Sequence, residues 1–282
     1  MSWTPQQTEM LAAMGLRLWA SPQPETSLLD ETVVSPPARV PARAPAPAPA
    51  PASAPDRASA PAARSAPGVA TAAPASAAAP ASRPALAALD WAALRDTVAA
   101  CRACGLCESR SQTVFGTGHP QAHWMVVGEA PGEQEDLQGE PFVGASGQLL
   151  DRMLQALNLT RAADGPEPPS QRVFIANTLK CRPPRNRNPT AAEMAQCEPF
   201  LVRQIELLRP RLILAMGRFA VQALLRSDEP IGKLRGRVHH YQGVPLVVTY
   251  HPAYLLRNLA DKARAWDDLC LAAQVAEAGQ PG

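Results

Sequence analysis

Five of the six cysteines in this sequence are spaced as metal ligands are spaced. Cys101, Cys104 and Cys107 form a C-x2-C-x2-C run, and Cys181 and Cys197 follow later in the chain. Two neighbouring thiolates and two distant ones can complete a four-thiolate site, which suits either zinc or an iron–sulfur cluster. The spacing permits Cys101 with Cys104, or Cys104 with Cys107, as the neighbouring pair. The sixth cysteine stands apart, and we expect it to be a small buried apolar side chain.

Polar side chains of catalytic types follow three short apolar runs. Gly128-Glu129-Ala130-Pro131-Gly132 follows the first run, Asn177 follows the second, and His251 follows the last. In open parallel sheets, ligands bind just beyond the carboxyl ends of the strands. We therefore expect a carboxylate, an amide and an imidazole to meet at one edge of a sheet.

The elements that must position these groups alternate between strands and helices. The predicted strands are short and apolar, and most contain β-branched residues; they are Trp124–Val127, Val173–Ala176, Leu212–Ala215 and Leu246–Thr249. Helical patterns lie near residues 145–157, 190–208, 217–226 and 259–275. This alternation predicts an α/β fold, a three-layer α/β/α arrangement with a short central, mainly parallel four-stranded sheet.

Composition divides the 282 residues into a tail and one globular domain. The chain has 31 prolines, and about half of them fall between residues 21 and 90, where Ala is dense and large apolar residues are rare. Such a segment cannot bury enough apolar surface to offset the entropy of ordering. We expect residues 21–88 to be a disordered Pro/Ala-rich linker, 89–277 to be the globular domain, and 278–282 to be a short tail.

Residues 1–20 show the pattern of one short amphipathic helix. Met10, Met14 and Leu18 fall four residues apart and would form an apolar stripe. An apolar helix at the end of a long tether is typical of a docking peptide, so we expect a protein partner for it. The alternatives are that it folds back on its own domain or stays disordered.

The formal net charge is only +2, so any contact with nucleic acid must come from a local basic patch. No run of 18 apolar residues occurs, and the N-terminus lacks the basic start and apolar core of a signal peptide. We therefore expect no membrane association and a cytoplasmic, reducing compartment. Cysteines in such a compartment serve as metal ligands more readily than as disulfides.

Five motifs occur in order along the globular part: Gly128–Gly132, Pro141-Phe142-Val143-Gly144, Asn177…Lys180-Cys181-Arg182-Pro183-Pro184, Asn186-Arg187 and His251-Pro252-Ala253-Tyr254-Leu255-Leu256-Arg257. Together with four of the cysteines, these motifs resemble the family 4 uracil-DNA glycosylases, the iron–sulfur class of that superfamily. The resemblance covers about residues 95–270 and leaves out the N-terminal tail.

The resemblance implies a [4Fe–4S] cluster with Cys101, Cys104, Cys181 and Cys197 as its ligands. Cys107 is then a bystander, because the family pattern does not require a cysteine there. We expect a structural role for the cluster, because hydrolysis of a glycosidic bond needs no redox step.

The resemblance also implies an activity: uracil is flipped out of single- or double-stranded DNA and its N-glycosidic bond is hydrolysed, which leaves an abasic site for base-excision repair. Asn177 would read the edge of the base, Phe142 would stack on it, and His251 would donate a hydrogen bond to the departing uracil anion. A carboxylate would stabilise the cationic sugar and orient the water. We divide that role between Glu129 and Glu135.

One position departs from the better-known relatives of family 1, which have Asp where this chain has Ala130. Ala130 cannot position the water. We expect the backbone of Ala130 and Pro131 to line the base pocket beside Glu129.

The partner that follows is uracil-containing DNA, bound by a monomer. The expected phosphate contacts are basic side chains beside the pocket: Lys180, Arg182, Arg185, Arg187 and Arg257. Leu255 and Leu256 lie in the segment that, in the superfamily, wedges into the space left by the base. The alternative for these two leucines is ordinary helix core.

Other functions of the same fold fit the residues less well. A covalent uracil-trapping relative carries His in a basic loop after the second strand, and residues 182–189 contain none. An iron–sulfur DNA-binding or polymerase-associated module without activity has no need for Glu129, Asn177 and His251. A zinc-stapled DNA-binding protein would explain the cysteines but not the polar residues at the strand ends.

Overall fold

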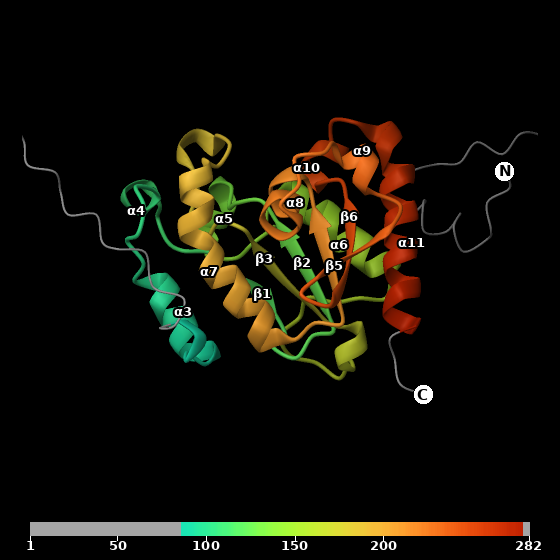
Figure 1. Ribbon diagram of the computed structural model, residues 1–282, viewed down its shortest axis with the longest axis horizontal. Coiled ribbons are helices and arrows are strands. Elements are labelled where there is room, and N and C mark those ends of the chain that lie inside the picture. The colour runs from blue at the N-terminus through green and yellow to red at the C-terminus, as the bar shows by residue number, and fades with distance from the viewer. Residues whose placement is uncertain (1–85, 279–282) are drawn as a thin grey trace, which may run out of the picture. The chain divides into compact units, whose positions relative to one another are not determined.

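The computed structural model describes residues 86–278 (Figure 1). The expected docking helix at residues 1–20, nearly all of the linker and the last four residues lie outside the described residues. Leu86, which the composition assigns to the linker, is buried in the core, so the folded part includes a few residues before 89. The last helix ends at Ala278, one residue into the expected tail.

In the described part of the chain, six strands form one sheet in the order β1-β3-β2-β4-β6-β5. The middle of the sheet consists of the four predicted parallel strands: β2 (Trp124–Gly128), β3 (Val173–Asn177), β4 (Leu212–Met216) and β6 (Val244–Thr249). Antiparallel strands β1 (Thr117–Gly118) and β5 (Val238–Tyr241) complete the edges. The prediction of four strands was therefore too low. β1 has two residues and β5 has no buried residue, so neither contains the apolar run that marks the others.

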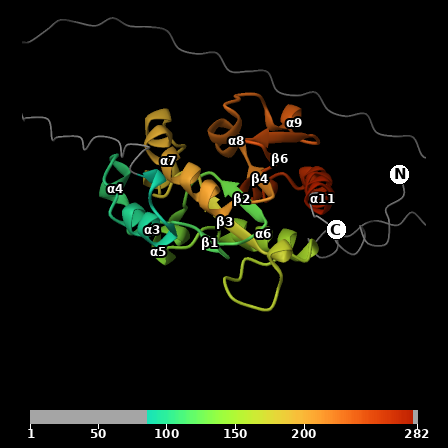
Figure 2. The same ribbon diagram turned by 60° about the horizontal axis from the view of Figure 1, so that its bottom comes forward.

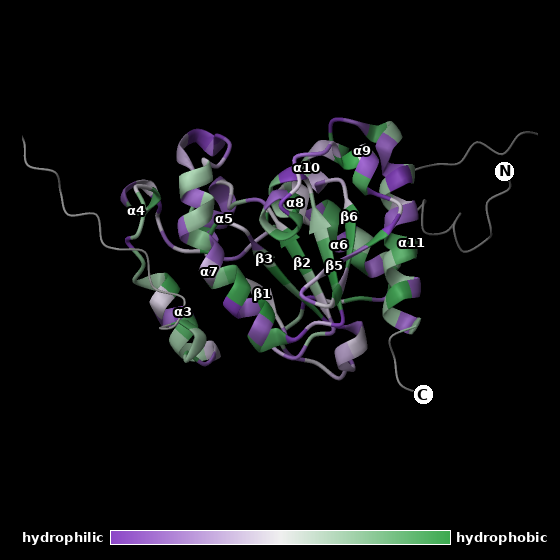
Figure 3. Cartoon of the chain, in the orientation of Figure 1, coloured by the Kyte–Doolittle hydropathy of each residue, from purple (hydrophilic) through white to green (hydrophobic). Residues whose placement is uncertain are grey.

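Side chains along each central strand alternate between two cores, as the pleat of a strand requires. In β2, Met125 and Val127 face one core, and Trp124 and Val126 face the other. The first core is closed by α3 (Trp91–Ala99), α7 (Ala191–Leu208) and α8 (Arg218–Leu225). The second is closed by α6 (Ala145–Ala156), α10 (Pro252–Leu255) and α11 (Lys262–Ala278). The predicted three-layer fold is confirmed, with helices on both sides of an apolar sheet (Figures 2 and 3).

The predicted helical patterns correspond to α6, α7, α8 and α11, whose ends lie at or within a few residues of the predicted ones. The start of α7 is fixed by a capping box, in which Thr190 and Glu193 each bind the other's backbone N–H. The shorter helices are α4 (Leu106–Ser109), α5 (Glu133–Gln138) and α9 (Ile231–Leu234). No helix among the described residues is long and apolar enough to cross a membrane.

The strand order creates a crevice at the carboxyl ends of β2 and β4. After β2 the chain crosses to β3 on one side, and after β4 it crosses to β6 on the other side. The loops therefore leave the sheet in opposite directions between these two neighbouring strands. Open α/β sheets bind their ligands at such a switch point.

Candidate active site

A cavity of about 840 Å³ opens at this switch point. Its walls come from the loops that follow β2, β3, β4 and β6. They include seven of the residues predicted for the pocket: Glu129, Ala130, Pro131, Glu135, Phe142, Asn177 and His251. Side chains that are far apart in the sequence thus share one cavity.

Asn177 ends β3 and pairs with Gly128 at the end of β2. The residue is only 2% exposed, and its Oδ1 has no hydrogen-bond partner among the described residues. A Cβ atom at position 128 would lie 2.5 Å from that Oδ1 and 2.6 Å from Cζ of Phe142. Gly128 therefore provides the space in which the amide and the aromatic ring reach the cavity. A buried amide oxygen without a partner is an acceptor available to a ligand.

Phe142 lies in the loop before α6 with a φ of 56°, a left-handed conformation that is rare for a bulky residue. The guanidinium of Arg161 holds this conformation. Arg161 donates to the carbonyl oxygens of Pro141 and Phe142, each at 2.9 Å, and to Oδ2 of Asp151 at 2.8 Å. The strained backbone is thus fixed by a charged side chain that sequence reasoning missed.

His251 is the N-cap residue of α10, and its Nδ1 accepts a hydrogen bond of 3.2 Å from the N–H of Ala253. An imidazole nitrogen that accepts carries no proton, so the ring proton is on Nε2. The ring of His251 stacks on that of Phe142, with the centroids 5.4 Å apart and the planes inclined by 30°.

Burial and, to a smaller extent, the positive charge of Arg257 lower the pKa of His251 to about 4, against a small opposing effect of Glu135. The imidazole is therefore neutral at pH 7. A neutral ring with its proton on Nε2 is a hydrogen-bond donor that needs no change of protonation before it acts.

The two predicted carboxylates have different surroundings. Glu135 is buried and accepts three backbone N–H groups, from Gly132, Val143 and Gly144, each at 3.1 Å. It ties the loop after β2 to the loop that carries Phe142. Glu129 lines the cavity, and burial raises its pKa while the nearby Arg218 acts in the opposite direction.

Two residues predicted to contact DNA are buried instead. Lys180 is 1% exposed, and its Nζ donates to the carbonyl oxygen of Asn177 and to Oε1 of Gln204. It cannot reach a phosphate, and the prediction for it was wrong. Leu255 is 1% exposed and packs in the core between the sheet, α6 and α11, so it cannot act as a wedge.

The other predicted DNA contacts lie at the surface. Arg187 and Arg257 are exposed and line the cavity. Arg185 is exposed, and Arg182 is half-buried with Nε donating to Asn186 at 2.7 Å. Leu256, beside the buried Leu255, is 43% exposed.

The cavity also contains side chains that sequence reasoning missed. Arg218, which directly follows Gly217 at the end of β4, lines the wall near Glu129. Tyr250 and Tyr254 line it as a stacked pair, with ring centroids 5.1 Å apart. Arg218 comes two residues after β4 and Tyr250 directly after β6, so their places after strand ends are the signal that could have identified these two residues.

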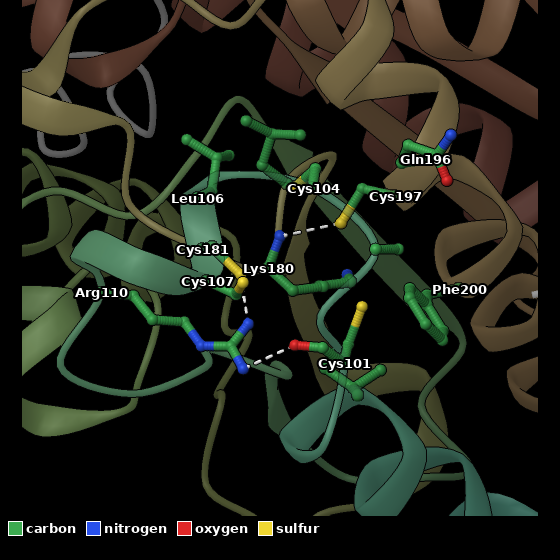
Figure 4. Close-up of a pocket in the computed structure, with 13 residues that line it drawn as sticks. Cys101, Cys104, Leu106, Cys107, Arg110, Lys180, Cys181, Gln196, Cys197 and Phe200 are labelled. Carbon is green, nitrogen blue, oxygen red and sulfur yellow. Dashed lines mark hydrogen bonds between the residues drawn. The ribbon is translucent and has the colours of Figure 1, made fainter. Parts of the chain in front are cut away.

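The predicted cysteine ligands line a second, smaller cavity, formed by residues around α4, the segment after β3 and the first half of α7 (Figure 4). Cys101, Cys104, Cys181 and Cys197 all contribute to its wall, and so does Cys107. Among the described residues, no three Cys, His, Asp or Glu side chains are grouped closely enough to hold a single metal ion.

Two of the sulfur atoms accept hydrogen bonds. Arg110 Nη1 donates to Cys181 Sγ at 2.9 Å, and the backbone N–H of Lys180 donates to Cys197 Sγ at 3.2 Å. The pKa of Cys197 is raised to about 12, mainly by burial and against the opposing effect of Lys180. Burial also raises the pKa of Cys181, against the opposing effect of Arg110, and the thiol of Cys101 makes a smaller contribution to both increases. Thiols so deeply buried become thiolates only beside compensating positive charge, such as bound metal provides.

Comparison with known proteins identifies the class. Residues 115–270, more than half of the chain, match the family described as the uracil DNA glycosylase superfamily. This span contains the central sheet and the switch-point cavity. The chain belongs to this superfamily.

Curated relatives narrow the class to one family. The type-4 uracil-DNA glycosylase of Archaeoglobus fulgidus is 41% identical over 167 residues, which are 56% of this chain and 79% of that protein. The type-4 enzyme of Saccharolobus solfataricus is 41% identical over 174 residues, 58% of this chain and 76% of that protein. That of Pyrobaculum aerophilum is 39% identical over 193 residues, 65% of this chain and 93% of that protein. The chain is a member of the type-4 uracil-DNA glycosylase family, as its motifs predict.

Proposed function

We propose that this chain hydrolyses the bond between uracil and deoxyribose in DNA and leaves an abasic site for base-excision repair. The observation that carries the proposal is the meeting of Asn177, Phe142, His251 and Glu129 around one cavity. A base stacked within a duplex cannot reach side chains so deep in the protein, so the nucleotide must be flipped out. Flipping costs a few kcal/mol and is least costly at a mismatch or in a single strand.

Asn177 reads the flipped base. Uracil presents an N–H between two carbonyl oxygens, and an amide side chain can accept from that N–H and donate to a neighbouring oxygen. The unpartnered Oδ1 of Asn177 is the acceptor this pattern needs. Phe142, held by Arg161, offers an aromatic face on which the base stacks.

His251 stabilises the leaving group. As the glycosidic bond breaks, negative charge collects on the uracil oxygens, and a fixed donor aimed at one of them lowers the barrier. The neutral imidazole, with Nδ1 held by the N–H of Ala253, supplies that donor from Nε2. Because the ring is already oriented, little reorganisation accompanies the reaction.

Glu129 stabilises the sugar as it becomes cationic and orients the attacking water. Its carboxylate lines the cavity, whereas the carboxylate of Glu135 is engaged by three backbone N–H groups. We therefore propose that Glu129 orients the attacking water. Glu135 has a positioning role, because it holds the loop that contains Ala130 and Pro131.

DNA would be held at the rim of the cavity. Arg187 and Arg257 line it, and Arg182 and Arg185 extend the same basic surface, as phosphate contacts require. Leu256 is the exposed apolar side chain that could fill the space left by the flipped base.

We further propose a [4Fe–4S] cluster bound by Cys101, Cys104, Cys181 and Cys197. The four thiols line one cavity, as ligands of a shared group must. The resemblance to the iron–sulfur class of the superfamily is what favours a cluster over zinc. N–H donors to two of the sulfurs suit cluster ligands, because such hydrogen bonds stabilise negative charge on sulfur. The cluster can carry electrons, but the hydrolysis needs none, so its role is structural.

The same cysteines support a reducing compartment, the cytoplasm, because exposure to an oxidising one would convert thiols to disulfides. We also propose that the chain acts as a monomer.

The proposal is tested with the full chain and matched oligonucleotides that carry uracil or thymine at one position. We expect strand cleavage, after alkaline treatment of the abasic site, only with uracil and without added metal or nucleotide. Binding without cleavage would support a non-catalytic module instead. A protein–DNA adduct that survives denaturation would support covalent trapping.

A further inference from the structure

One short segment of the chain joins the two cavities. Asn177, at its start, lines the switch-point cavity, and Cys181, at its end, lines the cysteine cavity. Its backbone continues the pairing with the loop after β2, because the N–H groups of Thr178 and Leu179 donate to the carbonyl oxygens of Gly128 and Glu129, each at 3.1 Å. A displacement at one end of this segment would therefore move the other.

Lys180 fixes the segment from within. Its side chain folds back, and Nζ donates to the carbonyl oxygen of Asn177 at 2.8 Å and to Oε1 of Gln204 at 2.6 Å. Gln204, on α7, is fully buried and donates in turn to the carbonyl oxygen of Phe115 at 2.8 Å. The backbone N–H of Lys180 donates to the sulfur of Cys197 at 3.2 Å (Figure 4).

Burying the charged amino group of Lys180 costs free energy, because the group loses its contact with water. Its two hydrogen-bond partners among the described residues are neutral oxygens, and buried charges are ordinarily paired with opposite charge. Cys197 and Cys181 are near enough to this amino group to act on it electrostatically. The amino group also binds the backbone carbonyl of the residue that reads the base, so it touches one site directly and is influenced by the other.

The position of the Asn177 amide depends on its backbone, because no hydrogen bond fixes the amide oxygen. Its Oδ1 has no partner in the described structure, so the direction of the amide depends on its backbone and on the packing of Gly128 and Phe142. A misplacement of about 1 Å at a reacting site can cost about 100-fold in rate.

We propose that Lys180 is a positioning residue, which fixes the backbone of Asn177 and links the direction of its amide to the cysteine site through the segment between them. The proposal rests on the function proposed above. It assigns the cysteine site a second task beside stabilising the fold: holding the base-reading amide in place.

The test compares full-length holoprotein variants. Lys180→Met keeps the length and apolar stem of the side chain but removes the amino group. Gln204→Met removes one partner of that group without altering the segment, and serves as the second test where Lys180→Met does not fold. Lys233→Met, at an exposed lysine on α9, is the matched control.

Three properties are measured: iron content with the visible spectrum, the single-turnover rate of uracil excision, and the ratio of affinities for oligonucleotides that contain either non-hydrolysable 2′-fluoro-2′-deoxyuridine or thymidine at one position. For Lys180→Met we expect unchanged iron, a rate lower by about 10- to 100-fold and a clearly reduced affinity ratio. Gln204→Met should shift in the same direction to a smaller extent, and Lys233→Met should match the parent.

Parental rates and affinity ratios in both Lys180→Met and Gln204→Met would overturn the proposal. A loss of rate that simply follows a loss of iron would also overturn it, because Lys180 would then only stabilise the cluster. Absence of excision by the parent chain would instead refute the proposed function, and this inference would fall with it.

Discussion

The imidazole of His251 stacks on the ring of Phe142, with 5.4 Å between the centroids and 30° between the planes. Phe142 covers one face of the imidazole, and the N–H of Ala253 occupies Nδ1. The Nε2–H edge is the part of the ring left to bind a ligand. The side chain proposed to stack on the base therefore also orients the side chain proposed to stabilise the negative charge of the departing base.

Replacement of His251 by Ala should lower the single-turnover rate of excision by about 100- to 1000-fold, because a fixed donor to a developing anion contributes about 3–4 kcal/mol. Circular dichroism should show a folded protein. His240→Ala, at an exposed histidine on β5, is the control and should leave the rate unchanged. A rate for His251→Ala within a few-fold of the parent would show that the leaving group is stabilised elsewhere.

The pH dependence of the excision rate should follow the ionisation of the Glu129 carboxyl. Burial raises the pKa of this carboxyl above its usual value of 4.5, and only the ionised form can stabilise a cationic sugar. The rate should therefore be constant near neutral pH and fall as the pH falls through that raised pKa. His251 has a pKa of about 4 and is neutral at higher pH, so the part of the fall that lies well above pH 4 reports Glu129.

Single-turnover rates measured across the acidic range test this assignment. Glu129→Gln should be slower at pH 7 and should lose the acidic limb, whereas Glu133→Gln, at an exposed glutamate in α5, should keep the parental profile. Persistence of the limb in Glu129→Gln would assign it to another group.

Arg161 should matter for rate although it lies outside the cavity wall. The left-handed backbone of Phe142 costs about 1–3 kcal/mol, and Arg161 stabilises it through two carbonyl oxygens. Arg161→Met should lower excision by about 10- to 100-fold, because the stacking ring loses its fixed position. Arg152→Met, at an exposed arginine on α6, is the control. An unchanged rate in Arg161→Met would show that packing alone holds Phe142.

The features that could be predicted from the sequence are those with a local signature. Buried parallel strands are short apolar runs, and polar residues directly after them must gather at one sheet edge, so Asn177 and His251 could be placed together before the structure was seen. The edge strands β1 and β5 have no such run. The pairing of β1 is decided by the neighbouring strand β3. β5 pairs with β6 through the two-residue turn Gln242-Gly243, in which both residues have a positive φ, and this hairpin signal was missed.

The errors concern side chains whose direction is set by tertiary packing. Lys180 stands among arginines and has the composition of a phosphate contact, but α7 covers it and Gln204 provides a buried acceptor. Leu255 and Leu256 are chemically alike, yet the end of α10 turns one into the core and the other outward. The clamp of Arg161 on Phe142 joins residues on either side of α6, and the segments that flank this helix have no periodic pattern from which the contact could be predicted.

The sequence left two cysteines as alternatives for one position, and the structure gives a reason to choose. The thiol of Cys101 contributes to the raised pKa of Cys104, of Cys181 and of Cys197, so it lies near all three. Cys107 contributes only to the raised pKa of Cys104 among these three.

We therefore expect Cys101→Ala to lose iron, sulfide and visible absorption, while Cys107→Ala keeps the parental content of all three. Alanine is the replacement of choice because a serine oxygen can itself bind iron. Loss of iron from Cys107→Ala would reverse the assignment, and a colourless parent protein that contains zinc after anaerobic purification would exclude the cluster itself.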